Sequence, residues 1–136
     1  MDIAIFPKEV VGTVMHEGIE FSSCTFIEIF LDGASFCEIE DFEGGVVVWD
    51  ELKKSAVDSG KYLIFTCYCG IPEDGGWDFI NVTHLDNEII WEFDRVSCRK
   101  IVFNKADYIS QINDCGALLR LESYPLAMPV SRIPYY

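Results

Sequence analysis

Alternation of apolar and polar residues along the chain predicts several β-strands joined by short turns. The pattern is clearest over residues 79–94, where apolar side chains recur at every second position on each side of Asp86-Asn87. A two-residue loop at this turn creates one apolar face of cross-strand pairs, His84 with Ile89, Val82 with Trp91 and Ile80 with Phe93. We therefore expect this hairpin to belong to the core rather than to a binding surface.

Other segments also have the composition of strands. They are residues 10–15, 19–21, 26–31, 34–39, 61–69 and 99–103. Glu17-Gly18 and Asp32-Gly33 are candidate hairpin turns, and the second is a dipeptide that favours a type I′ turn. Residues 61–69 are apolar on both faces, which predicts a central strand.

Helical spacing predicts two helices. The first covers residues 49–59, with Asp50 as its N-cap and Gly60 just beyond its end. The second follows Asn104 as N-cap and runs to about Glu122. Its expected buried stripe is Tyr108, Ile109, Ile112, Cys115 and Leu119.

Together these elements predict an α+β fold. We expect an antiparallel β-sheet or half-barrel, one long C-terminal helix and a short central helix. The length of 136 residues suits one domain, so residues 1–136 are interpreted as a single domain. Prolines at 125, 129 and 134 predict an extended tail at 123–136.

The net charge of −13 restricts the classes of partner that this protein could bind. Residues 1–60 carry 13 acidic and 3 basic side chains, residues 61–95 carry 7 and 2, and residues 96–136 carry 3 and 5. Such a surface repels nucleic acid and anionic membranes, so we expect neither as a partner. A basic protein partner would be attracted instead.

Two acidic clusters are the candidate partner-binding surface. An aromatic residue accompanies each cluster as a possible anchor. The candidate residues are Glu38, Glu40, Asp41, Phe42, Glu43, Glu73, Asp74, Trp77 and Asp78. The alternative interpretation is that these clusters only keep the surface soluble.

The N-terminal residues have neither the basic region nor the apolar stretch of a secretory signal, and no stretch is long enough to span a membrane. We therefore expect a cytoplasmic protein. In a reducing compartment its six cysteines should be free and mostly buried thiols.

Candidate chemistry is sparse. Cys67 and Cys69 would share one face of a strand and, with His84, could form a metal site or a small enzyme centre. A Cys-x-x-Cys motif and a His pair at ligand spacing are both lacking. The sequence therefore predicts no catalytic residue, no metal site and no cofactor, and the Cys/His centre is kept as an alternative.

Several motifs between residues 60 and 120 resemble small bacterial immunity proteins of polymorphic and contact-dependent growth inhibition toxin systems. These motifs are Phe65-Thr66-Cys67-Tyr68-Cys69-Gly70, Asp74-Gly75-Gly76-Trp77, Ile90-Trp91-Glu92-Phe93, Ile101-Val102-Phe103 and the helix from Tyr108 to Leu119. Relatives often have a cysteine where this chain has Glu73-Asp74, and this departure weakens a metal-site interpretation.

The resemblance implies a cytoplasmic, non-enzymatic protein that blocks a cognate toxin domain. The acidic surface favours a basic toxin, such as a nuclease, because a nuclease must attract phosphates. It implies no fixed binding residues, because each immunity protein is matched to its own toxin. A general adaptor or a nucleic-acid mimic is a third hypothesis.

Overall fold

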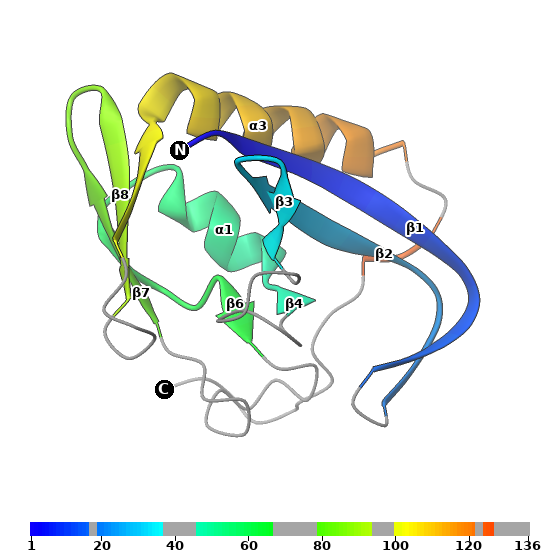
Figure 1. The fold of residues 1–136 in the computed structure, drawn as a ribbon. Coiled ribbons are helices and arrows are strands. Elements are labelled where there is room, and N and C mark those ends of the chain that lie inside the picture. The colour runs from blue at the N-terminus through cyan, green and yellow to red at the C-terminus, as the bar shows by residue number, and fades with distance from the viewer. Residues whose placement is uncertain (17–18, 37–45, 67–78, 94–99, 122–123, 127–136) are drawn as a thin grey trace.

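The computed structural model describes residues 1–16, 19–36, 46–66, 79–93, 100–121 and 124–126. These residues form antiparallel sheets and two helices, which confirms the α+β prediction (Figure 1). The strands are β1 (Ile3–His16), β2 (Ile19–Leu31), β3 (Ala34–Ser35), β4 (Val46–Val47), β5 (Gly60–Tyr62), β6 (Phe65–Thr66), β7 (Ile80–His84), β8 (Glu88–Phe93) and β9 (Lys100–Asn104). The helices are α1 (Trp49–Ser55) and α3 (Lys105–Leu119).

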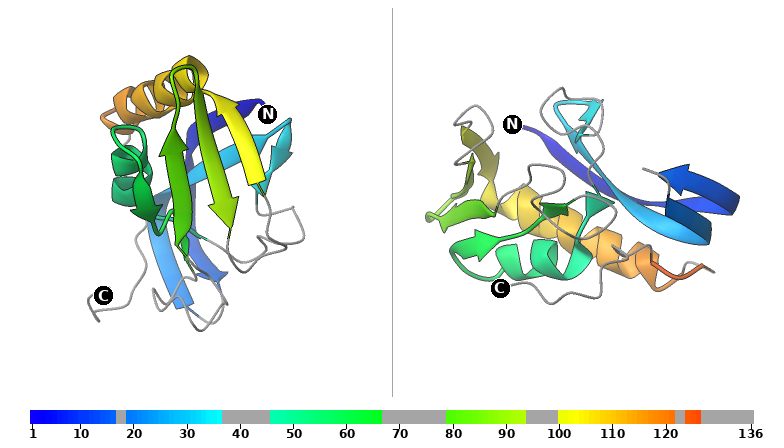
Figure 2. Two further views of the ribbon diagram at one scale, coloured as in Figure 1. Left: turned by 90° about the vertical axis from the view of Figure 1, so that its left-hand side faces the viewer. Right: turned by 90° about the horizontal axis from the view of Figure 1, so that it is seen from below.

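The strands form three separate sheets. The N-terminal sheet has the order β1-β2-β3, the C-terminal sheet has the order β5-β7-β8-β9, and β4 pairs with β6. The N-terminal and C-terminal sheets lie on opposite sides of the molecule, and α3 runs across both, packing on β1, β8 and β9 (Figures 1 and 2). Among the described residues the strands form no closed barrel.

The hairpin of β7 and β8 has the predicted register. His84 lies opposite Ile89, Val82 opposite Trp91 and Ile80 opposite Phe93. All of these except His84 are buried, and Trp91 has no exposed surface. Its ring makes edge-on contacts with four aromatic rings, those of Phe65, Phe93, Phe103 and Tyr108. The hairpin is therefore part of the core, as predicted.

A directed chain of buried hydrogen bonds joins β8 to both helices. Trp91 Nε1 donates to Tyr108 Oη over 3.2 Å, and Tyr108 Oη lies 2.6 Å from Ser55 Oγ. Ser55 Oγ donates to the Leu52 carbonyl over 2.5 Å. Because Ser55 uses its only proton there, Tyr108 must be the donor to Ser55. Each buried hydroxyl thus both donates and accepts.

Strands β1 and β2 form one long hairpin, so the predicted strands at 10–15, 19–21 and 26–31 are parts of two continuous strands. Two residues, Val11 and Gly12, oppose Ser23 in a β-bulge. Gly12 has a φ of 85°, a conformation that favours glycine, and its N–H donates to Ser23 Oγ. This bulge interrupts the alternation from which strands are predicted.

Asp32-Gly33 form the predicted turn between β2 and β3, and both residues have positive φ, as a type I′ turn requires. Of the predicted strand 34–39, the structure describes Ala34–Ser35 as strand, and Glu38 lies outside the described residues.

The predictions for helix 49–59 and strand 61–69 were partly wrong. Helix α1 begins at Trp49 and ends at Ser55, so Asp50 is in the first turn rather than at the N-cap, and Gly60 begins β5. The segment 61–69 is not one central strand. The chain leaves the C-terminal sheet after β5, an edge strand, and joins β4 through β6. Passage between two sheets explains why residues 63–66 are buried one after another.

The C-terminal helix confirms its predicted cap and stripe. Asn104 Oδ1 accepts from the Asp107 N–H over 3.0 Å. Tyr108, Ile112 and Cys115 are buried, and Ile109 and Leu119 pack against the same core. The helix ends at Leu119, shortly before the predicted end.

Of the six cysteines, Cys24 and Cys115 are described, and both are buried free thiols. Burial raises the pKa of Cys24 and raises that of Cys115 to about 11. Both thiols are therefore almost entirely protonated at neutral pH. Because the thiolate is the reactive form, both should react slowly.

Replacing Trp91 with alanine should lower the free energy of unfolding by about 3–5 kcal/mol, because it leaves a large cavity in the core. Urea unfolding measures this change. The adjacent exposed residue provides a matched control, since Glu92→Ala should change stability by less than about 0.5 kcal/mol. Normal stability of Trp91→Ala together with lost function would show instead that Trp91 contacts a partner.

Alkaline pH should destabilise the protein through Tyr108. Burial raises the pKa of Tyr108 from 10.0 to about 12, although hydrogen bonds with Ser55 and Trp91 oppose this rise. The folded state therefore prefers the neutral phenol. This contribution is complete below the unfolded pKa and is lost as pH rises from 10 to about 12, a loss of about 2–3 kcal/mol.

Urea unfolding across this pH range, compared between wild type and Tyr108→Phe, isolates that contribution. The variant should be less stable at neutral pH, because Trp91 loses its acceptor, but should lose less stability above pH 10. Parallel pH profiles for the two proteins would contradict a buried neutral Tyr108.

Candidate functional site

All nine residues of the predicted partner-binding surface lie outside the described residues. They are Glu38, Glu40, Asp41, Phe42 and Glu43, in the segment 37–45, and Glu73, Asp74, Trp77 and Asp78, in the segment 67–78. The residues that bracket these segments are part of the protein interior: Phe36, Val46 and Thr66 are buried and Phe79 is half-buried. Both acidic clusters are therefore attached to the core at each end.

The alternative Cys/His centre is described only at His84, because Cys67 and Cys69 lie outside the described residues. His84 Nε2 lies 2.7 Å from the Ser55 carbonyl oxygen, and its backbone N–H donates to Ser59 Oγ. A carbonyl only accepts, so Nε2 carries a proton and is not free to bind a metal. In the described part of the chain, His, Cys, Asp and Glu form no group of three that could hold a metal ion.

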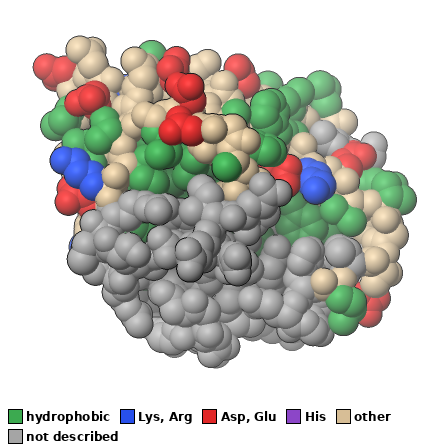
Figure 3. Space-filling model, in the orientation of Figure 1, with side chains coloured by type: hydrophobic (Ala, Val, Ile, Leu, Met, Phe, Trp, Pro, Cys, Tyr) green, Lys and Arg blue, Asp and Glu red, His purple; other side chains and the backbone are tan. Residues whose placement is uncertain are grey.

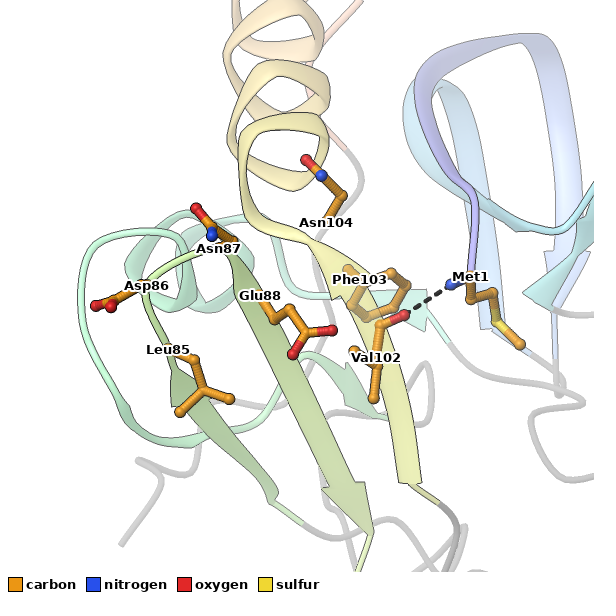
Figure 4. Close-up of a pocket in the computed structure, with 8 residues that line it drawn as sticks. All are labelled: Met1, Leu85, Asp86, Asn87, Glu88, Val102, Phe103 and Asn104. Carbon is orange, nitrogen blue, oxygen red and sulfur yellow. Dashed lines mark hydrogen bonds between the residues drawn. The ribbon is translucent and has the colours of Figure 1, made fainter.

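A pocket of about 660 Å³ lies where the β7–β8 turn meets the end of β9 (Figure 4). Its lining comes from the turn, from β9 with the residue that caps α3, and from the N-terminus. The lining residues are Met1, Leu85, Asp86, Asn87, Glu88, Val102, Phe103 and Asn104.

Backbone hydrogen bonds fix the walls of this pocket. The Lys105 N–H donates to the Asn87 carbonyl over 2.9 Å, which ties the turn to the start of α3. The turn itself is closed by a 2.9 Å bond from the Leu85 N–H to the Glu88 carbonyl. On the opposite side, the Met1 amino group donates to the Val102 carbonyl over 2.7 Å (Figure 4).

The pocket combines two carboxylates and the Met1 ammonium group with apolar surface. Leu85 and Met1 are 45% and 53% exposed, although both side chains are apolar. Asp86 and Glu88 are exposed carboxylates, and Figure 4 shows Glu88 lying over β8 and β9 while Asp86 projects from the turn. Asp and Glu side chains also gather along the upper edge of the face in Figure 3.

This chemistry suits a cation on an apolar stem. A lysine or arginine side chain could lay its methylene groups along Leu85 and place its charge near Glu88. Asp86 and Glu88 are the acidic side chains among the residues that line the pocket. With the exposed apolar side chains of Leu85 and Met1, they offer a cationic side chain both a charge partner and an apolar surface.

Comparison of the chain with protein-family models, with curated proteins and with solved structures finds no match in any of the three. The case for a function therefore depends on the surface of the molecule. No helix of the described residues is long and apolar enough to cross a membrane.

The sequence identified two components of this pocket but not their proximity. Asp86-Asn87 was predicted as a turn and Asn104 as a cap. They come together because Glu88 pairs with Asn104 in the β8–β9 register, and no local pattern specifies that register.

Proposed function

We propose that this protein is an immunity protein: a cytoplasmic, non-enzymatic binding module that neutralises a cognate bacterial toxin domain. The observation that carries the proposal is the acidic, partly apolar pocket on fixed backbone, in a chain with a net charge of −13. The resemblance to immunity proteins between residues 60 and 120 agrees with this function.

Electrostatics explains how such a protein would recognise its target. A nuclease domain must attract phosphate groups, so lysine and arginine surround its cleft. An acidic inhibitor exploits the same field, which steers the encounter and opposes association with other acidic proteins.

The binding surface we propose includes residues that the structure describes and residues that lie outside the described ranges. In the described part, the pocket receives one lysine or arginine of the toxin, with Glu88 as its charge partner and Leu85 beside its stem. The acidic clusters at 38–43 and 73–78 would add further contacts, with Phe42 and Trp77 as apolar anchors.

Charge reversal tests this proposal. Asp86→Lys/Glu88→Lys should abolish or strongly reduce protection of cells that express the cognate toxin domain. Truncating a desolvated charge pair typically costs about 2–5 kcal/mol, or roughly 30-fold or more in affinity. Association with the purified toxin should also slow as ionic strength rises, because salt screens the attraction.

A matched control changes the net charge equally. Glu20→Lys/Asp114→Lys replaces two exposed acids that do not line the pocket, and this variant should still protect. The two undescribed clusters are tested separately with Glu38, Glu40 and Glu43 changed to Lys, and with Glu73 and Asp74 changed to Lys. If the pocket variant folds, protects and keeps its salt dependence, the pocket is not the binding site.

A further inference from the structure

A second pocket, of about 350 Å³, lies at the opposite end of α3 from the acidic pocket. Helix α1 runs beside the C-terminal half of α3 (Figure 2), and the pocket opens between them. Trp49 and Lys53 line it from α1, and Gly116, Leu119 and Arg120 line it from the end of α3. Tyr124 and Leu126 complete the lining.

The wall formed by Tyr124 and Leu126 is held in place by β2. The Thr25 N–H donates to the Pro125 carbonyl over 2.8 Å, and the Thr25 hydroxyl donates to the Tyr124 carbonyl over 3.1 Å. Thr25 is fully buried, and it also forms a parallel bridge with Leu126. Trp49, on the facing wall, is only 7% exposed. The pocket is therefore preformed.

The charge of this pocket is opposite to that of the protein. Both charged residues that line it, Lys53 and Arg120, are basic, although the whole chain has 23 acidic and 10 basic side chains. Lys53 Nζ lies 3.4 Å from Asp50 and 5.8 Å from the centre of the Trp49 ring. Arg120 is exposed and, among the described residues, forms no salt bridge.

A glycine in the wall keeps this space open. Gly116 lies within α3, where glycine is less favourable than alanine by about 1 kcal/mol. A Cβ at this position would lie 3.5 Å from Trp49 Cζ2, an ordinary contact, so sterics alone do not require glycine. Its missing side chain instead enlarges the pocket beside the Trp49 ring.

We infer that this pocket binds a small organic carboxylate with a flat apolar body. Arginine pairs with carboxylates through two parallel hydrogen bonds, and the half-buried Tyr124 ring beside Leu119 and Leu126 offers a surface for an aromatic group. The volume is within the range of about 300–1,000 Å³ that is typical of small-molecule sites. The site is separate from the acidic pocket and does not depend on the proposed function.

A structural role for Arg120 is the competing explanation. A cation near the end of α3 also stabilises the helix dipole. In that role Arg120 would stabilise the helix without binding a ligand. A binding measurement therefore distinguishes the structural explanation from the ligand-binding one.

The test is a two-dimensional NMR titration of the full chain with 4-phenylbutyrate as the probe. The amide of Gly116 and the indole N–H of Trp49 should shift, with a dissociation constant of about 1 mM or lower. Arg120→Gln should weaken binding at least tenfold, because it removes both charge-assisted hydrogen bonds to the carboxylate. Gly116→Leu should abolish binding by filling the pocket.

One control removes a charge of the protein outside the pocket, and two others change the charge of the probe. Lys54→Gln removes a neighbouring base of α1 that does not line the pocket, and it should leave the affinity unchanged. The neutral analogue 4-phenylbutanol and the cation 4-phenylbutylamine should bind about tenfold more weakly or not at all. Absence of shifts up to about 10 mM probe, or equal binding of the amine, would overturn the inference.

Discussion

The hydrogen-bond chain from Trp91 through Tyr108 and Ser55 to the Leu52 carbonyl determines how the two helices sit against the C-terminal sheet. Trp91 and Tyr108 have no exposed surface, and Ser55 has none either. A buried donor or acceptor that loses its partner costs about 1–3 kcal/mol, so every link constrains the next. The arrangement of β8, α3 and α1 in the structure satisfies all of them at once.

Both pockets lie on elements that this arrangement joins. Helix α3 has the acidic pocket at its first residues and the basic pocket at its last turn, and α1 forms a wall of the second. The aromatic rings around Trp91 fill the space between sheet and helices, while the hydrogen bonds orient them. Acidic residues near the start of α3 and Arg120 near its end also complement the helix dipole. The two pockets therefore lie at opposite ends of a single helix.

Local patterns were sufficient for the elements that bury one face. The hairpin of β7 and β8 and the helix capped by Asn104 follow directly from alternation and helical spacing. Prediction failed where tertiary contacts replaced local ones. Helix α1 is capped by Val48 without a side-chain bond, and the chain between β5 and β6 changes sheets while buried on both faces.

Neither pocket could be predicted, because each joins segments far apart in the sequence. The acidic pocket needs the β8–β9 register, and the basic pocket needs Thr25 to hold residues 124–126. The acidic clusters at 38–43 and 73–78 remain predictions, since they lie outside the described residues.

A double-mutant cycle between Ser55→Ala and Tyr108→Phe tests most directly whether this hydrogen-bond chain organises the core. Free energies of unfolding are measured for wild type, for both single variants and for the double variant. Removing either hydroxyl already breaks the link between them, so the second change should cost less in the presence of the first. We expect a coupling free energy of about 1 kcal/mol or more between the two residues. Additive effects, with a coupling of less than about 0.3 kcal/mol, would contradict the account.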